Sequence, residues 1–89
     1  MSTRQRIVAG NWKMNKNYQE GRDLTSDIIR LLQPTDVKVV LIPPFIHMKS
    51  VSNIIQDVMN IYLGAQNCHQ EEKGAYTGEV SAAMLKSTG

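Results

Sequence analysis

Two kinds of apolar pattern alternate along the 89 residues, and their order is the strongest constraint on the fold. Three short apolar runs, at residues 6–12, 37–42 and 61–66, have the length and composition of strands. Apolar residues at helical spacing follow each run, and no repeated Asn-Gly signal for hairpins lies between the strands. Strands that alternate with helices predict right-handed crossovers and a parallel sheet, so the fold class is α/β. An open doubly wound sheet and a closed barrel are both built from such units, and periodicity alone does not choose between them.

The first helix has a clear start, a buried stripe and a stop. Asn17, with Glu20 three residues later, predicts an N-terminal capping box. The apolar residues of this helix fall on one stripe, formed by Leu24, Ile28, Leu31 and Leu32. Pro34 ends it, since proline cannot continue a helix.

The rest of the chain repeats the pattern. Residues 37–42 are almost continuously apolar, as in a parallel strand buried on both faces, and two prolines end the run. The second helix is predicted from an apolar stripe made of Met48, Val51, Ile55 and Val58. A third strand at 61–66 leads into a long connection, 67–78, with Gly74 and Gly78 as turn residues. A short helix at 79–86 follows, and Gly89 is placed to cap it.

Charge and composition exclude several classes of partner. The net charge is +2, and Lys and Arg are scattered among Asp and Glu, so we expect no nucleic-acid partner. The polar N-terminal residues and the early break in the first apolar run leave no signal-peptide core. Nothing approaches the length of a membrane span, so we expect no membrane association. The single cysteine, Cys68, has no intramolecular partner and fits a cytoplasmic location.

The first strand carries the residues that are candidates for binding and catalysis. Side chains alternate along a strand, so the pattern predicts one face made of Ile7, Ala9, Asn11 and Lys13, and another made of Val8, Gly10 and Trp12. Ligands bind at the carboxyl ends of parallel strands, where Asn11 and Lys13 would lie. An amide and an ammonium aimed at one spot suit an anionic oxygen, such as a phosphate or an enediolate. The alternative interpretation is that Lys13 simply reaches into water and Asn11 caps a turn.

Four segments of the sequence resemble one known family. Ala-Gly-Asn-Trp-Lys-Met-Asn at residues 9–15 is similar to the first-strand signature of triose-phosphate isomerases. Pro-Pro-Phe at 43–45, Leu-Gly-Ala-Gln-Asn at 63–67 and Gly-Ala-Tyr-Thr-Gly-Glu-Val-Ser at 74–81 resemble later parts of that family's sequence, in the same order. The resemblance implies a (β/α)8 TIM barrel, of which this chain supplies the first three βα units. Residues 1–89 would then be the N-terminal portion of a single barrel domain whose remaining strands are absent from this chain.

The resemblance also implies an activity. Triose-phosphate isomerases interconvert dihydroxyacetone phosphate and glyceraldehyde 3-phosphate, a step of glycolysis and gluconeogenesis, by proton transfer through an enediolate. Lys13 and Asn11 match residues with catalytic and substrate-binding roles, and the family needs no metal or organic cofactor. The family's catalytic histidine and glutamate lie on its fourth and sixth strands, so we expect this chain alone to be inactive. His47 and His69 match neither of them.

Two further hypotheses concern partners. A connection as long as 67–78 is unusual between a strand and a helix. In the family the matching loop docks on a second subunit, which implies a homodimer with Met14, Tyr76, Thr77 and Glu79 at the interface. The alternatives are that Met14 fills a gap and that Thr77 only starts a helix. The competing hypothesis for the whole chain is a non-catalytic fragment whose open sheet edge associates with a complementary chain that carries the missing strands.

Three other features receive ordinary structural interpretations. Trp12 should pack beneath the helices, because alternation turns it away from Asn11 and Lys13. Cys68 and His69 could suggest a metal pair, but two adjacent residues do not build a tetrahedral site, so we expect a packed thiol beside a surface imidazole. The charges at residues 71–73 should face solvent.

Overall fold

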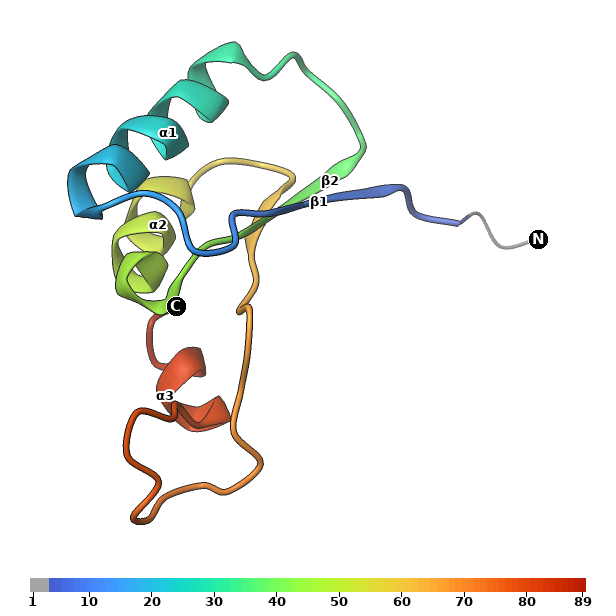
Figure 1. Ribbon diagram of the computed structural model, residues 1–89. Coiled ribbons are helices and arrows are strands. Elements are labelled where there is room, and N and C mark those ends of the chain that lie inside the picture. The colour runs from blue at the N-terminus through green and yellow to red at the C-terminus, as the bar shows by residue number, and fades with distance from the viewer. Residues whose placement is uncertain (1–3) are drawn as a thin grey trace.

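The computed structural model describes residues 4–89, and its elements follow the predicted order. The strands are β1 (Ile7–Asn11), β2 (Lys38–Ile42) and β3 (Ile61–Leu63). The helices are α1 (Tyr18–Leu31), α2 (Met48–Ile55) and α3 (Ala82–Lys86), with a 3-10 turn, η1 (Phe45–His47), leading into α2. Each strand is followed by a helix, which confirms the α/β class (Figure 1).

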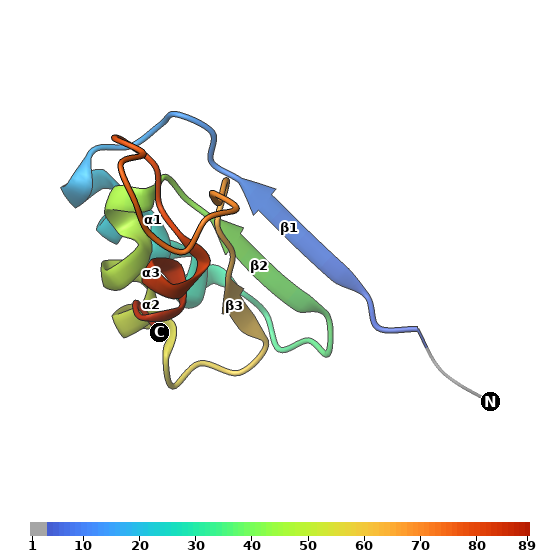
Figure 2. The same ribbon diagram turned by 90° about the horizontal axis from the view of Figure 1, so that it is seen from below.

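The three strands form a parallel sheet in the order β1-β2-β3. Asn11 pairs with Ile42, and Leu41 pairs with Leu63, so all three carboxyl ends lie at the same edge. The helices all lie on one side of the sheet (Figure 2). In the part of the chain that the structure describes, β1 and β3 are both edge strands, and the other face of the sheet is bare.

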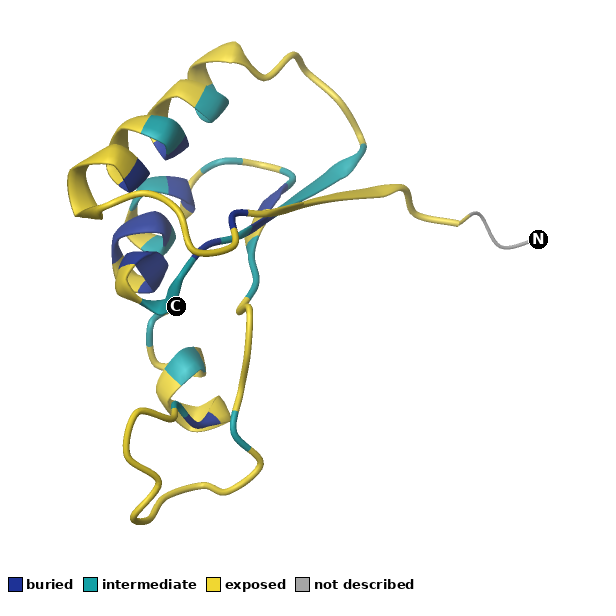
Figure 3. Cartoon of the chain, viewed as in Figure 1, coloured by how far each residue is buried: buried dark blue, intermediate teal, exposed yellow. Residues whose placement is uncertain are grey.

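The hydrophobic core lies between the sheet and the helices. Its buried members are Trp12, Leu41, Val51, Ile55 and Ile61, with Leu24 and Ile28 of α1 packed against them. The burial of Trp12 beneath the helices confirms its prediction. β2 was expected to be buried on both faces, and this was wrong, because only Leu41 is buried along it while the bare face leaves the rest half-buried. β1 is exposed along its whole length (Figure 3).

The predicted start of α1 is confirmed in detail. The Asn17 side chain accepts a hydrogen bond from the Glu20 backbone N–H at 2.9 Å, and the Glu20 carboxylate accepts one from the Asn17 backbone N–H at 2.9 Å. These two bonds satisfy two of the orphan donors at the helix start. The helix ends at Leu31, before Pro34.

Several boundaries differ from the prediction. β1 ends at Asn11, β3 ends at Leu63 and α2 ends at Ile55, each earlier than expected. α3 begins at Ala82 instead of residue 79, because the Ser81 hydroxyl accepts the Met84 backbone N–H at 3.2 Å and caps the helix. No helix within residues 4–89 combines the length and apolarity that crossing a membrane requires.

The loop of residues 67–78 projects with α3 away from the sheet and from α1 (Figure 1). Gly74 and Gly78 have φ values of 139° and 88°, which confirms them as turn residues. Cys68 lies exposed in this loop, so the expectation of a packed thiol was wrong. The loop turns outward at this point, and no core lies behind the thiol.

Candidate functional site

Asn11 stands at the carboxyl end of β1, on the face of the sheet opposite the helices. Its register partner, Ile42, lies on the same face, whereas Leu41, on the other face, is part of the core. Trp12, the next residue after Asn11, turns into that core. The alternation expected for this strand therefore holds up to Trp12, and Asn11 faces the bare side.

Lys13 departs from strand geometry. Its φ is 57°, in the left-handed region that residues with a Cβ rarely adopt. The backbone N–H of Lys13 donates to the Asn11 side-chain oxygen at 2.9 Å, so the turn is closed by a side chain. The rule that places Asn11 and Lys13 on one strand face therefore stops before Lys13, and a local turn sets the position of the lysine.

Gln66 connects this turn to the other two strands. Its side-chain amide nitrogen donates to the Lys13 carbonyl at 2.9 Å and to the Ile42 carbonyl at 3.0 Å. Gln66 follows β3, so the carboxyl ends of all three strands meet here. Gln66 was not predicted as a site residue. Its position shortly after a buried parallel strand was the available signal.

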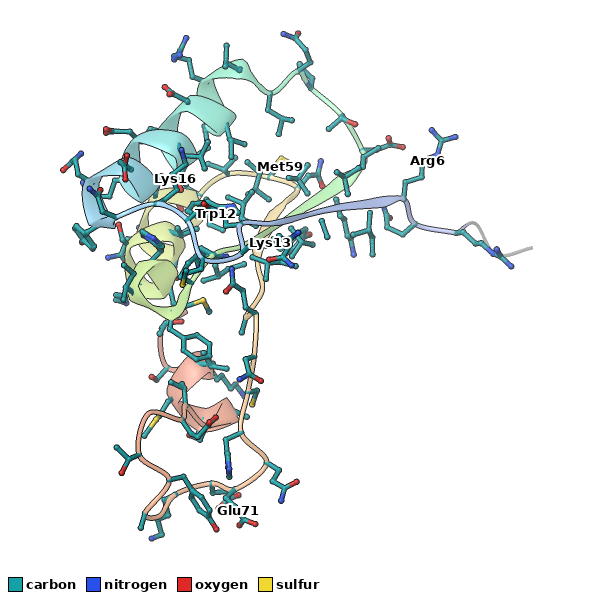
Figure 4. The ribbon with its side chains drawn as sticks, viewed as in Figure 1. Arg6, Trp12, Lys13, Lys16, Met59 and Glu71 are labelled. Atoms are coloured by element: carbon teal, nitrogen blue, oxygen red, sulfur yellow. The ribbon has the colours of Figure 1, made fainter. Side chains whose placement is uncertain are left out.

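A second set of contacts holds the segment between Lys13 and α1. Asn15 donates from its amide to the Trp12 carbonyl at 2.8 Å. His47 Nε2 lies 2.9 Å from the carbonyl of Lys16, another residue with a positive φ, of 78°. Figure 4 shows Trp12, Lys13 and Lys16 along this segment. The backbone between β1 and α1 is thus fixed by side chains at several points.

His47 is a buried residue that was not predicted from the sequence as part of the core. It is only 1% exposed, and its ring lies 5.5 Å from that of Trp12, centroid to centroid, and directly against Gly21 of α1. The signal was its position: His47, Val51 and Ile55 recur at intervals of four, which extends the apolar stripe of α2 backward by one turn. The His47 ring lies on the helix side of the sheet, whereas Asn11 lies on the bare face.

The geometry suits an anion at the carboxyl edge of the sheet. Asn11 and Lys13 are both exposed there. The side-chain oxygen of Asn11 already accepts the Lys13 backbone N–H, so the amide nitrogen of Asn11 is the group that can donate hydrogen bonds to a ligand. An ammonium and an amide N–H can together stabilise a phosphate or a developing oxyanion.

The residues expected at a dimer interface lie in two separate places. Met14 is 95% exposed beside Lys13. Tyr76, Thr77 and Glu79 are exposed on the projecting loop, away from Met14 in this chain. Tyr76 stacks on His69, with ring centroids 4.4 Å apart. Within one chain the structure therefore does not bring these two groups together.

His69 is integrated in its loop. Its Nδ1 accepts the Glu71 backbone N–H at 3.1 Å, and its own backbone N–H donates to the Val80 carbonyl at 2.8 Å. His69 is half-buried, and the imidazole organises the turn that carries Glu71. Within residues 4–89 no three His, Cys, Asp or Glu side chains gather as possible metal ligands.

Comparison with known proteins settles the family. The family model described as "Triosephosphate isomerase" matches residues 6–89. The chain belongs to the triosephosphate isomerase family. Its three βα units are therefore the start of a TIM barrel.

Curated relatives agree with this assignment. The triosephosphate isomerase of Bacteroides fragilis is 50% identical over 88 residues, which is 97% of this chain and 35% of the relative. Those of Amoebophilus asiaticus and Cytophaga hutchinsonii are 48% and 46% identical, covering 91% and 97% of this chain and 33% and 35% of each relative. The chain thus spans about a third of the length of the triosephosphate isomerases it matches.

Proposed function

We propose that the full-length protein containing this segment is a triose-phosphate isomerase that interconverts dihydroxyacetone phosphate and glyceraldehyde 3-phosphate. The observation that carries the proposal is the position of Asn11 and Lys13 at the carboxyl edge of a parallel sheet in a chain of this family. That edge is where TIM-barrel enzymes hold their substrates. The single free cysteine is consistent with work in the reducing cytoplasm.

The reaction moves one proton between neighbouring carbons. A base removes a proton from the carbon next to the carbonyl, and the carbonyl oxygen gains a proton, which gives the enediol. The former carbonyl carbon then takes a proton, while the hydroxyl on the neighbouring carbon loses its proton and becomes the new carbonyl. Atoms and charges balance without a metal or an organic cofactor. We expect the histidine and the glutamate of this chemistry to come from the part of the relatives' length that this chain does not span.

In this proposal Lys13 and Asn11 stabilise charge. The Lys13 ammonium neutralises the substrate phosphate and part of the negative charge that builds on the enediolate oxygen. The Asn11 amide nitrogen donates to the substrate, while its oxygen holds the Lys13 turn. The backbone of Lys13 is held by the Asn11 side chain before substrate arrives, and such preorganisation lowers a reaction barrier.

The test is Lys13→Ala in the full-length isomerase. Loss of a positioned electrostatic group costs about 100-fold or more in turnover. Lys16→Ala is a matched control, since Lys16 is another exposed lysine with a positive φ in the same segment. We expect a large loss of kcat/KM for the first variant and little change for the second. Near-normal turnover of Lys13→Ala would refute the role.

We further propose a homodimer formed through the loop of residues 67–78. The projection of this loop and the 95% exposure of Met14 beside the site support it, since a symmetric dimer would cover both. Thr77→Arg in the full-length isomerase should weaken dimerisation, whereas Ser26→Arg on the outer face of α1 should not. Analytical ultracentrifugation at low protein concentration checks this. An unchanged dimer mass for Thr77→Arg would count against the loop.

The bare face and the two edges of the sheet leave apolar surface uncovered. Ile7 and Val8 are 60% and 61% exposed on β1, and a hollow of about 630 Å³ opens between the end of α2, β3 and Gly89. We propose that the remaining βα units of a barrel cover these surfaces, on the same polypeptide or on a complementary chain. Intact mass of every polypeptide in a purified sample distinguishes these two arrangements. A folded, soluble monomer of 10.0 kDa would contradict both.

A further inference from the structure

Gln66 is a polar side chain whose contacts the proposed chemistry does not use. Its amide nitrogen donates two hydrogen bonds to backbone carbonyls, one to that of Lys13 and one to that of Ile42. Lys13 lies 53 residues earlier in the sequence and Ile42 lies 24 residues earlier. A single side chain thus joins the segments that follow β1 and β3 to the last residue of β2.

The contact falls on the backbone of the proposed phosphate-binding lysine itself. Lys13 has a φ of 57°, a conformation that a lysine keeps only where its surroundings impose it. Asn11 accepts the N–H of Lys13, and Gln66 donates to its C=O. The amide and the carbonyl of the strained residue are therefore both held, each by a side chain from a different strand end.

Contacts elsewhere in the segment act on other residues. Asn15 bonds to the carbonyl of Trp12, and His47 bonds to that of Lys16. They stabilise the two flanks of the turn, and Gln66 reaches its centre from the side of β3. The shared carbonyl of Ile42 also accepts the Trp12 backbone N–H at 3.0 Å, which ties the turn to the β1–β2 ladder.

We propose that Gln66 is a positioning residue that holds Lys13 in its left-handed conformation and so aims the ammonium at the substrate phosphate. The proposal rests on the proposed isomerase function, because it acts through Lys13. Gln66 does not itself need to touch the substrate. Its two hydrogen bonds tie the backbone of Lys13 to the last residue of β2 and to the segment after β3, which is the kind of support that a charged site needs.

The test uses the full-length isomerase and the affinity for glycerol 3-phosphate, a probe with the same phosphate group as the substrates. Gln66→Met keeps the length of the side chain and removes both donors. Two lost hydrogen bonds correspond to a loss of affinity of about tenfold. Gln19→Met is the matched control, because the exposed Gln19 amide bonds only within α1, to Asp23 at 2.9 Å, and it should leave the affinity unchanged.

A double-mutant cycle separates positioning from general support of the fold. In a Lys13→Met background there is no ammonium to aim, so Gln66→Met should change the affinity for glycerol 3-phosphate by less than about twofold. The thermal midpoint should fall by the same amount in both backgrounds. If Gln66→Met does not fold, Gln66→Asn keeps an amide that is too short to reach both carbonyls, and an intermediate loss of affinity is expected.

Two results would overturn the inference: unchanged affinity in the Gln66 variants, or an equal loss with and without Lys13. If Lys13→Met weakens binding strongly while Gln66→Met does not, only the positioning role fails. If Lys13→Met leaves both binding and turnover intact, the proposed function of Lys13 fails, and the role of Gln66 fails with it.

Discussion

Gly21 of α1 faces the buried His47 ring so closely that no side chain fits there. A Cβ built on Gly21 would overlap the imidazole, lying 2.5 Å from Cε1 and 3.1 Å from Cγ. The ring cannot swing aside cheaply, because it is 1% exposed, packs against Trp12 and bonds to the Lys16 carbonyl. Gly21→Ala is therefore a direct test of how the first two helices pack.

Opposing effects set the magnitude. Alanine in place of glycine inside a helix stabilises it by about 1 kcal/mol. Overpacking a well-filled core costs about 1–3 kcal/mol, and loss of the His47 hydrogen bond adds about 1 kcal/mol. The balance is a net destabilisation of about 2 kcal/mol, or roughly 4–8 °C in the thermal midpoint of a protein of barrel size.

The assay is urea and thermal unfolding of the full-length isomerase. Ser26→Ala, on the exposed face of the same helix, is the control and should shift stability by less than about 0.5 kcal/mol. In a His47→Ala background the clash is gone, so Gly21→Ala should become stabilising. If Gly21→Ala stabilises equally with and without His47, the close packing of α1 on His47 is refuted.

Three further outcomes follow from the same contacts. Asn17→Ala removes the capping box of α1 and should lower the free energy of unfolding by about 1 kcal/mol in urea titrations, and an unchanged midpoint would contradict the cap. Val51→Ala leaves a cavity at a residue that is 1% exposed and should cost about 2 kcal/mol, whereas a cost below about 0.5 kcal/mol would mean that this core is loosely packed. A hydrogen bond with Ser50, followed by contacts with Arg22, lowers the pKa of Tyr18 below 10.0. Because Tyr18 loses its proton at a lower pH in the folded state than in the unfolded state, the interaction stabilises the folded protein above pH 10.0. This stabilisation is lost as the pH falls through the lowered pKa. Ultraviolet titration of Ser50→Ala should move the Tyr18 transition upward, and no movement would rule out the hydrogen bond.

Local patterns in the sequence predict the order of strands and helices well, because these elements are determined by residues close together in the sequence. The capping box at Asn17 and the stripe on α2 depend on residues a few positions apart, and the structure has both. The end of β1 was misjudged because alternation assumes strand geometry, whereas Lys13 takes a left-handed φ imposed by Asn11 and Gln66. One of those contacts spans 53 residues, and no local pattern encodes it.

Burial of polar residues was the other limit of sequence reasoning. The burial of His47 was not predicted, since histidine is seldom fully buried. Its hydrogen bond to Lys16 and the missing side chain of Gly21 make the burial favourable, and both depend on how α1 packs against η1 and α2. The start of α3 was also missed, because residue 79 looked suitable while Ser81 supplies the actual cap.

The central claim is that Lys13 is held at the carboxyl edge of the sheet to meet a triose phosphate. A crystal structure of the full-length isomerase with bound glycerol 3-phosphate tests it most directly. The account predicts the Lys13 ammonium within about 4 Å of a phosphate oxygen, with φ of Lys13 still positive and Gln66 bonded to its carbonyl. A phosphate bound elsewhere, with Lys13 turned away into solvent, would contradict the account.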